Sequence, residues 1–336
     1  MKQASEGIGK DIQTTLPLDS KAKEQTLLYR LDAFDKRLSR PIFLAKLPAV
    51  AEYALSVPGN FFGVPVVTLL VTPNALAMYF SESTPLSTLW HCVVCLLIVA
   101  VLILWHVVLA GNKNAIQLFY GPTLGALAAI LGVVLLSWMP DELSSFRHIG
   151  YFQLTAWCLA VIPVALLKPS FARLRPVMCH NDNDDDDDDG KMMKAAAEAK
   201  HLSVLPRLFR RDGRASFPSG DAAGAMAVAY ALGQCEPHGF FLPSILIVVL
   251  SATGRMYWQA HYFGDVVLGA VLAWICCWLL EQALIRTGGE SCRAQRWHAL
   301  MAHGALCATV ILSRIYFKTK VFQSGTLRTD EVCKKL

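Results

Sequence analysis

The sequence predicts an all-α membrane protein, a bundle of about six to eight transmembrane helices. Of its 336 residues, 54% are hydrophobic and only 17% are charged, whereas an average soluble domain is about 45–50% apolar and about 25% charged. The apolar residues gather in blocks of roughly 17 to 24, about the length that a helix needs to cross a bilayer. These observations exclude a soluble globular protein, a disordered chain and a small disulfide-rich fold.

The apolar segments lie, in order, at approximately 61–80, 87–110, 115–138, 149–167, 219–235, 239–255, 262–284 and 297–313. The second and third contain no Asp, Glu, Lys or Arg, and are the clearest spans. Prolines at 65 and 73 interrupt the first segment, and histidines at 298 and 303 lie in the last. Each of these two either spans the bilayer or lies in its interface. Six spans follow from the others, and eight is the best single count.

The segments divide the chain into four regions. We expect a polar, basic N-terminal region (1–60), an extra apolar segment with its connection (61–95), a membrane core (96–285) and a C-terminal segment with a basic tail (286–336). The core contains a loop insert at 177–214, in which Asp182 and Asp184 to Asp189 form a dense acidic run. Such like charges repel one another and cannot pack, so the insert is predicted to be disordered.

The charge distribution predicts an orientation. The net charge of +5 includes the aspartate run, so the rest of the chain is clearly basic. Residues 1–46 alone carry nine Lys or Arg. With eight spans, the positive-inside rule places the N-terminus, the long loop 168–217 and the C-terminus in the cytosol. If 61–80 does not cross, the long loop moves to the other face. No basic stripe with interleaved aromatic residues indicates a nucleic-acid surface.

A first cluster of charged residues follows the segment 149–167. Lys168 and Arg175 are seven residues apart, so on a helix both cations face one point. Charged residues packed against membrane helices are costly and usually functional. The alternative is that Lys168, Arg173 and Arg175 are simple cytosolic anchors.

A second cluster, Phe217-Pro-Ser-Gly-Asp221, opens the next apolar segment. Proline, Ser219 and Gly220 at a helix start present free backbone N–H groups at the positive end of the helix dipole, which can cradle an anion. Gly220 and Gly224 also form a G-x-x-x-G pattern, which is more typical of close helix packing.

A third cluster contains Arg255, His261 and Asp265. His261 and Asp265 are four residues apart, so the carboxylate can hold one imidazole nitrogen and leave the other as a base or nucleophile. They can also be a satisfied structural pair. However, two spans separate the second cluster from the third, so all three clusters meet on one face of the membrane. Cations, an anion cradle and a His–Asp pair together predict a phosphate site with a nucleophile.

The three motifs, K-x6-R-P, P-S-G-x and R-x5-H-x3-D, resemble in this order the signature of the type 2 phosphatidic acid phosphatase (PAP2) superfamily. That superfamily includes lipid phosphate phosphatases, sphingosine phosphate phosphatases, dolichyl diphosphatases and glucose-6-phosphatases. The resemblance covers roughly 96–285 and implies a core of six helices. The N-terminal region, the aspartate run and the end of the chain lie outside it.

The resemblance also implies a role for each matching residue. The phosphate oxygens would be held by Lys168, Arg175, Ser219, Gly220 and Arg255. Fixed cations and N–H groups suit the charge on these oxygens. His261 would attack phosphorus to form a phosphohistidine, and Asp265 would fix its tautomer. No metal or cofactor is expected.

Two positions depart from the family pattern. Gly254 replaces the usual Ser before Arg255, which we expect to be a small loss. Asp221 stands where the second motif normally has His, the general acid for the leaving oxygen. An Asp in the first turn of a helix is stabilised as the anion, the wrong state for an acid, whereas a bound phosphate favours its protonation. Asp221 is therefore an acid at low pH, an adaptation to diphosphate substrates, or the mark of a degenerate enzyme.

We expect an integral-membrane phosphatase that hydrolyses lipid phosphate mono- or diphosphate esters. The expected partners are a lipid phosphate or isoprenoid diphosphate substrate and the bilayer, with no nucleic acid, and a homo-oligomer is left open. The resemblance suggests the endoplasmic reticulum or another endomembrane. The alternative is a weak or inactive relative that binds lipid phosphates. A transporter or channel would explain the helices, but not the His–Asp pair and P-S-G cradle together.

Overall fold

The structure is a computed structural model of the whole chain. It describes residues 27–52, 54–55, 72, 89, 93, 128–138, 147–171, 173–176, 192, 195–196, 200, 215–235, 241–287 and 292–323. Apart from isolated residues, the predicted spans 61–80 and 87–110 lie outside the described residues, as do most of the span 115–138 and the aspartate run.

The described part of the chain is helical. Its elements are α2 (Leu27–Leu44), a short apolar helix (Ala128–Ser137), α7 (Arg147–Phe171), α11 (Gly220–Cys235), α12 (Phe241–Tyr257), α13 (Phe263–Thr287) and α14 (Cys292–Gln323). Within this part no strand occurs, and the β pairing is a single antiparallel bridge between Leu174 and Ala215. The predicted all-α class is therefore confirmed.

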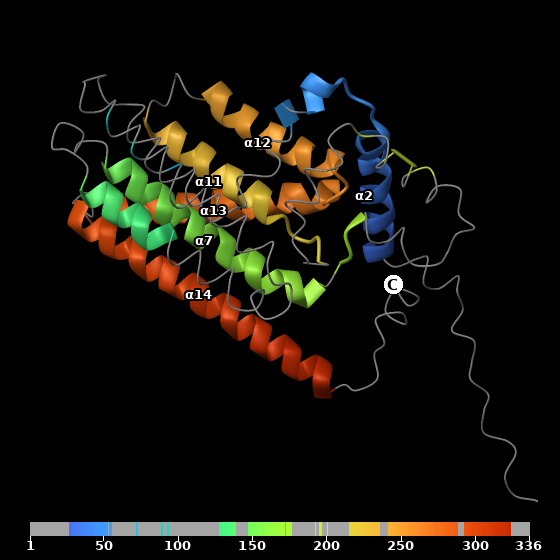
Figure 1. The fold of residues 1–336 in the computed structure, drawn as a ribbon. Helices are drawn as coiled ribbons and strands as arrows, with labels where there is room; N and C mark the ends of the chain where they lie inside the picture. The colour runs from blue at the N-terminus through green and yellow to red at the C-terminus, as the bar shows by residue number, and fades with distance from the viewer. Residues whose placement is uncertain are drawn as a thin grey trace, which may run out of the picture.

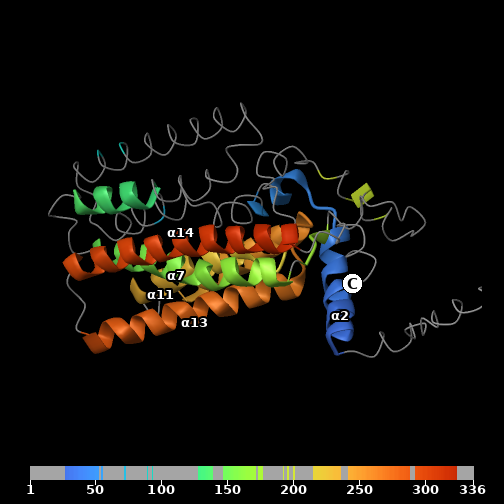
Figure 2. The same cartoon turned by 90° about the horizontal axis from the view of Figure 1, so that it is seen from below.

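Helix α11 lies at the centre of the bundle, where it packs on α7, α12 and α13. Its sequence is rich in alanine, and Ala222, Ala223, Ala227 and Ala231 are fully buried. Small residues allow helix backbones to approach closely. Helix α14 packs along α7 on the outside. Figures 1 and 2 show α7, α11, α13 and α14 running alongside one another.

Two of the helices are long and apolar enough to cross a bilayer, namely α7 and α13 from Phe263 to Arg286. Most of the apolar window of α7 is buried inside the protein, whereas most of that of α13 is not. Large apolar side chains are exposed along the length of α13, at Phe263, Val267, Val271, Trp274 and Trp278. An exposed apolar stripe of this length fits contact with lipid better than contact with water. The predicted six to eight spans are not established by these two helices.

The helix ends that carry the three sequence clusters meet at one end of the bundle. Helix α7 ends there, α11 begins there, and the turn between α12 and α13 lies there as well (Figure 1). Helix α2 crosses this same end, at a steep angle to the other helices in both views (Figures 1 and 2). It contacts α12 and α13.

Candidate active site

The end of α12 places His261. The N–H of Ala260 donates to the carbonyl of Arg255 at 3.0 Å, and the N–H of Gln259 donates to the carbonyl of Met256 at 2.8 Å. This is the Schellman pattern of helix termination, which needs a left-handed residue. Gln259 supplies it with φ 52°, a conformation that costs a non-glycine residue about 1–2 kcal/mol. This turn ends α12 and leads into α13, and His261 lies in the connection between the two helices.

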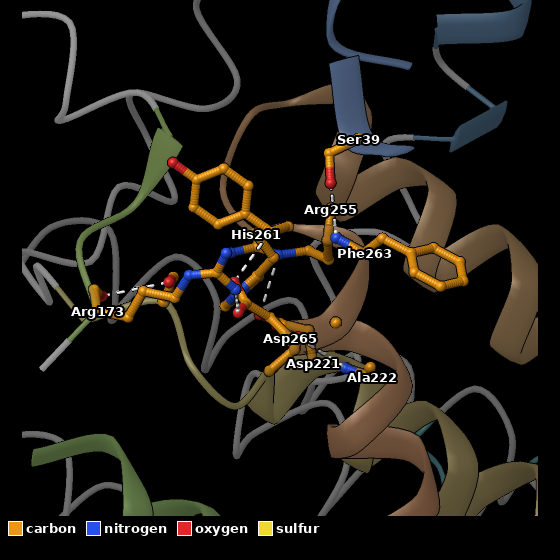
Figure 3. A network of polar contacts seen from close by, with 12 residues as sticks. Ser39, Arg173, Asp221, Ala222, Arg255, His261, Phe263 and Asp265 are labelled. Atoms are coloured by element: carbon orange, nitrogen blue, oxygen red, sulfur yellow. Dashed lines mark hydrogen bonds and ion pairs between the residues drawn. The ribbon is translucent and has the colours of Figure 1, made fainter. Parts of the chain in front are cut away.

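His261 lies between two carboxylates. Its Nδ1 is 3.6 Å from Oδ2 of Asp265, and its Nε2 is 3.8 Å from Oδ2 of Asp221. His261 and Asp265 are fully buried, and Asp221 is 9% exposed. Figure 3 shows Asp221, Asp265 and Arg255 gathered around the imidazole. Both separations exceed a normal hydrogen bond. Such contacts often tighten only when substrate is bound.

Burial and nearby arginines keep His261 neutral. Burial lowers the pKa of the imidazole, because the charged form loses its hydration. Asp221 and Asp265 raise the pKa, while the charges of Arg255 and Arg175 lower it, and the result is a pKa below the ordinary value of 6.5. A neutral imidazole has a lone pair on one nitrogen, as a nucleophile requires.

Asp265 is fixed by several elements at once. Its Oδ2 accepts from the N–H of Tyr262 at 2.8 Å, and its Oδ1 accepts from Nη1 of Arg173 at 2.8 Å. Its backbone carbonyl accepts from the N–H of Ser219 at 2.9 Å. The last bond joins α13 directly to the start of α11. The carboxylate that faces His261 is therefore held in place by hydrogen bonds and an ion pair.

Arg173 also lies at this candidate site, although the sequence indicates it only as a member of the basic cluster. Besides Asp265, its guanidinium pairs with Asp35 at 2.6 Å and Asp32 at 2.7 Å, both from α2. It also lies over the ring of Tyr262, 4.1 Å from the centroid. Burial would lower the pKa of Arg173, but the three carboxylates outweigh burial and raise the pKa above its ordinary value. This cation stays charged and links α2 to Asp265.

Helix α2 was also missed as a part of the site, because it belongs to the N-terminal region. Asp35 accepts a second hydrogen bond, from the N–H of Gly264 at 2.6 Å, and Ser39 accepts one from Phe263 at 2.8 Å. These two acceptors satisfy N–H groups in the first turn of α13. The signal in the sequence was the spacing of Asp32, Asp35 and Ser39, which share one face of a helix.

Asp221 pairs with Arg255 in this structure. Oδ2 of Asp221 is 3.1 Å from Nε of Arg255, and both side chains are almost completely buried. The carboxylate therefore lies between the arginine and the free side of His261, the side turned away from Asp265. A phosphate that binds Arg255 and reaches Nε2 has to share this space with Asp221.

The other predicted phosphate-binding residues lie at the same end of the bundle. Arg175 is 9% exposed, and its charge acts on the pKa of His261. Lys168 lies, partly buried, in the last turn of α7. Gly220 begins α11, so its N–H belongs to the first turn, where helix N–H groups have no partner within the helix. Ser219 is buried and caps α11, its Oγ accepting from the N–H of Ala222 at 3.3 Å.

A second buried cation lies next to this site. Lys200 is 5% exposed and donates to the carbonyls of Phe43 and Tyr257, and it lies 4.0 Å from the centre of the Tyr257 ring. Burial lowers the pKa of Lys200 to about 8. Tyr257 donates in turn to Glu52. Lys200 falls inside the predicted loop insert 177–214, so this residue of the insert is anchored to the core.

No metal site is found among the described residues, in which no three His, Cys, Asp or Glu side chains form a group suited to a metal ion. The positive charge around His261 comes from Arg255 and Arg175. The chemistry that this arrangement offers is an anion site beside a buried, oriented imidazole.

A comparison with known families supports this interpretation. Residues 151–287 match the family model described as the PAP2 superfamily. This match confirms the resemblance. It includes all three motifs, the candidate span of α13 and most of that of α7. It begins later than the predicted core of 96–285. None of the curated proteins and none of the solved structures that were compared matches the chain. Members of this superfamily are generally phosphatases, so the match indicates phosphatase chemistry but no particular substrate.

Proposed function

We propose that the protein is an integral-membrane phosphatase that hydrolyses lipid phosphate mono- or diphosphate esters through a phosphohistidine. One observation supports this most directly. A fully buried His261 has Asp265 on one ring nitrogen, and Asp221 and Arg255 on the side of the other. That order of acceptor, imidazole and cation is what a histidine nucleophile for phosphate needs.

In the first step, the N–H at Nδ1 of His261 donates a hydrogen bond to Asp265, which fixes the neutral tautomer whose lone pair is on Nε2. Nε2 attacks phosphorus, the bond to the leaving oxygen breaks, and that oxygen takes a proton from protonated Asp221. Arg255 and Arg175 stabilise the charge on the phosphoryl oxygens, with Lys168 and the start of α11 at Gly220.

In the second step, water attacks the phosphohistidine. The bond between phosphorus and Nε2 breaks, the water proton passes to the Asp221 carboxylate, and inorganic phosphate leaves. Asp221 thus alternates between acid and base. Because a general acid contributes about 10² to 10⁴ in rate, esters with poor leaving groups depend on it most. A diphosphate ester, whose leaving group is a phosphate, depends on it less.

We also propose that the bundle spans a bilayer with six to eight helices and that its substrate is a lipid. The exposed apolar stripe of α13 and the exposed apolar residues of α12 support this, among them Leu242, Leu246 and Val249. The predicted four-region organisation, with a core at 96–285, belongs to the same proposal. So does an endomembrane location, with the site on the cytosolic face if 61–80 spans.

The second candidate function is a lipid-phosphate-binding relative without turnover. The Asp221–Arg255 ion pair at 3.1 Å favours it, because the family position for the general acid is occupied here by a carboxylate paired with a cation. A paired carboxylate holds its charge and is a poor proton donor.

Phosphate release by the purified protein distinguishes the two. It is measured in detergent with EDTA, from a panel of lipid monophosphates and isoprenoid diphosphates between pH 5 and 8. Wild type is compared with His261→Ala and Asp221→His. Release that is lost in His261→Ala supports the phosphatase. No release from wild type, with activity gained in Asp221→His, supports the binding protein. Release that survives in His261→Ala contradicts both candidate functions, because it is turnover that does not use His261 as the nucleophile.

A further inference from the structure

Helix α2 has two faces of different character. Asp35, Ser39 and Phe43 are spaced by four residues and are buried against the bundle. Leu31, Phe34 and Leu38 are spaced by three and four residues, and so share another face. Their side chains are 53%, 58% and 41% exposed. Helix α2 is thus held against the bundle by one face, which is mostly polar. Its apolar face is exposed in the described part of the chain.

The position of α2 indicates what covers this apolar face. The candidate spans α7 and α13 run along the bundle, and α2 crosses their ends (Figures 1 and 2). A helix that crosses the end of a transmembrane bundle lies roughly in the plane of the membrane surface, at the level of the lipid headgroups.

The contact of α2 with α13 fixes this level. The N–H of Phe263, the first residue of α13, donates to Ser39 at 2.8 Å. Phe263 is also the first member of the exposed apolar stripe that runs along α13. The second half of α2 therefore crosses the bundle at the level where the exposed apolar stripe of α13 begins.

The charged residues of α2 fit a lipid surface as well. Arg30, Arg37 and Arg40 are exposed on this helix, and basic residues beside an apolar stripe are typical of helices that lie on anionic membranes. The acidic residues Asp32 and Asp35 face the protein, where they pair with Arg173. The helix therefore presents apolar and cationic groups outward and keeps its carboxylates inward.

We propose that α2 is an interfacial helix whose Leu31–Phe34–Leu38 face inserts into the bilayer surface beside the active site. Because Asp32 and Asp35 of α2 pair with Arg173, which pairs in turn with Asp265, the same helix joins this lipid-binding surface to the catalytic machinery. The inference rests on the membrane placement given under the proposed function, and does not depend on turnover.

The test uses an environment-sensitive fluorescent amino acid, introduced in the full chain at position 34. The matched control carries the same amino acid at Lys36, two residues away and nearly opposite on the helix. Lys36 makes an exposed pair with Asp32 at 2.8 Å, whose loss costs little. Both proteins are placed in phosphatidylcholine nanodiscs, with and without phosphatidylserine, and lipids with a nitroxide near the top of the acyl chain serve as quenchers.

We expect strong quenching and a blue-shifted emission at position 34 and several-fold weaker quenching at position 36. Weak quenching at both positions overturns the proposal, because neither side of the helix then contacts lipid. Equally strong quenching at both positions also overturns it, because the apolar face is then not the face that inserts. A label at Leu38 repeats the test if the first variant does not fold. The measurement is repeated with His261→Ala. Quenching that persists while phosphate release is absent separates the failure of catalysis from the failure of membrane docking.

Discussion

At the scale of single residues, the protonation of His261 should control activity at low pH. Burial lowers its pKa below 6.5, and the neutral form is the nucleophile. The acid limb of kcat/KM is therefore expected below pH 6.5. A pH–rate profile with a soluble diphosphate ester measures this limb in the free enzyme.

The same shift has a consequence for stability. An unfolded His261 binds a proton below pH 6.5 while the folded one stays neutral until its lower pKa is reached. The stabilising contribution is thus complete above pH 6.5 and is lost as the pH falls toward the folded pKa. His261→Asn should remove this part of the pH dependence of thermal unfolding. In the pH–rate profile, an acid limb above pH 6.5 would contradict the lowered pKa of His261.

Asp221 should act in opposite directions on binding and on turnover. Its carboxylate is 3.1 Å from Nε of Arg255, so Asp221→Asn removes a charge that competes with phosphate for the arginine. We expect vanadate, a phosphate analogue, to bind several-fold more tightly to this variant. If Asp221 is also the general acid, kcat on a monoester should fall by about 10² to 10⁴. Titration with vanadate and steady-state kinetics separate the two effects.

Tighter binding of vanadate with an unchanged kcat would mean that Asp221 only occupies the anion site. Weaker binding would mean that the carboxylate supports the arginine and does not compete for it. Asp221→Glu is the matched control, because it keeps the charge and changes only the reach of the side chain.

At the scale of elements, the contact between α11 and α13 depends on a glycine. A Cβ built on Gly269 would lie 2.3 Å from the backbone oxygen of Ser219, and no flexible side chain can move away to make room. Gly269→Ala should therefore destabilise the protein by about 1–3 kcal/mol. It should also reduce kcat, because it separates Ser219 from the Asp265 carbonyl.

The control for Gly269→Ala is Gly233→Ala in α11, where the new Cβ meets nothing within 4 Å. Alanine favours a helix over glycine by up to about 1 kcal/mol, so this variant should be as stable as wild type or more so. Thermal unfolding in detergent measures both. Similar midpoints for the two variants would show that the close approach of α13 to Ser219 is not needed.

The polar face of α2 should contribute to the stability of the site through Asp35 more than through Asp32. Asp35 accepts from Gly264 and pairs with Arg173, and its side chain is 12% exposed, whereas that of Asp32 is 38% exposed. Asp35→Ala leaves a partly buried N–H without its acceptor, at a cost of about 1–3 kcal/mol. We expect a lower unfolding midpoint and a lower kcat, and near wild-type values for Asp32→Ala. Equal effects would contradict this division.

The sequence predicted the residues around His261 because their chemistry is local. Arg255, His261 and Asp265 lie close together in the sequence, on either side of the connection between α12 and α13, and the P-S-G motif caps a helix. The participation of Arg173, Asp35 and Ser39 was not predictable in the same way. Their contacts join residues more than 90 positions apart, as between Arg173 and Asp265. Basic and acidic residues on an N-terminal helix are also common on solvated surfaces.

At the scale of the whole molecule, the arrangement of the helices fixes which connections share a side of the membrane. The site lies at the α2 end of the bundle. At the opposite end, Ala128–Ser137 finishes and α7 begins, and α13 finishes and α14 begins (Figures 1 and 2). The connections around positions 142 and 289 should therefore lie on the same side of the membrane, away from the site.

This arrangement makes the sidedness of the site testable without deciding whether 61–80 spans. A glycosylation acceptor on a flexible spacer is inserted at position 142, at position 289 or in the aspartate run, and each chain is synthesised with microsomes. With a cytosolic site, the first two acceptors should be glycosylated and the third should not. The reverse pattern would place the site in the lumen. With a cytosolic N-terminus it would also remove 61–80 from the spans, because one span fewer moves the long loop to the other face. Different results at 142 and 289 would contradict the bundle itself, since both positions connect helices at the same end.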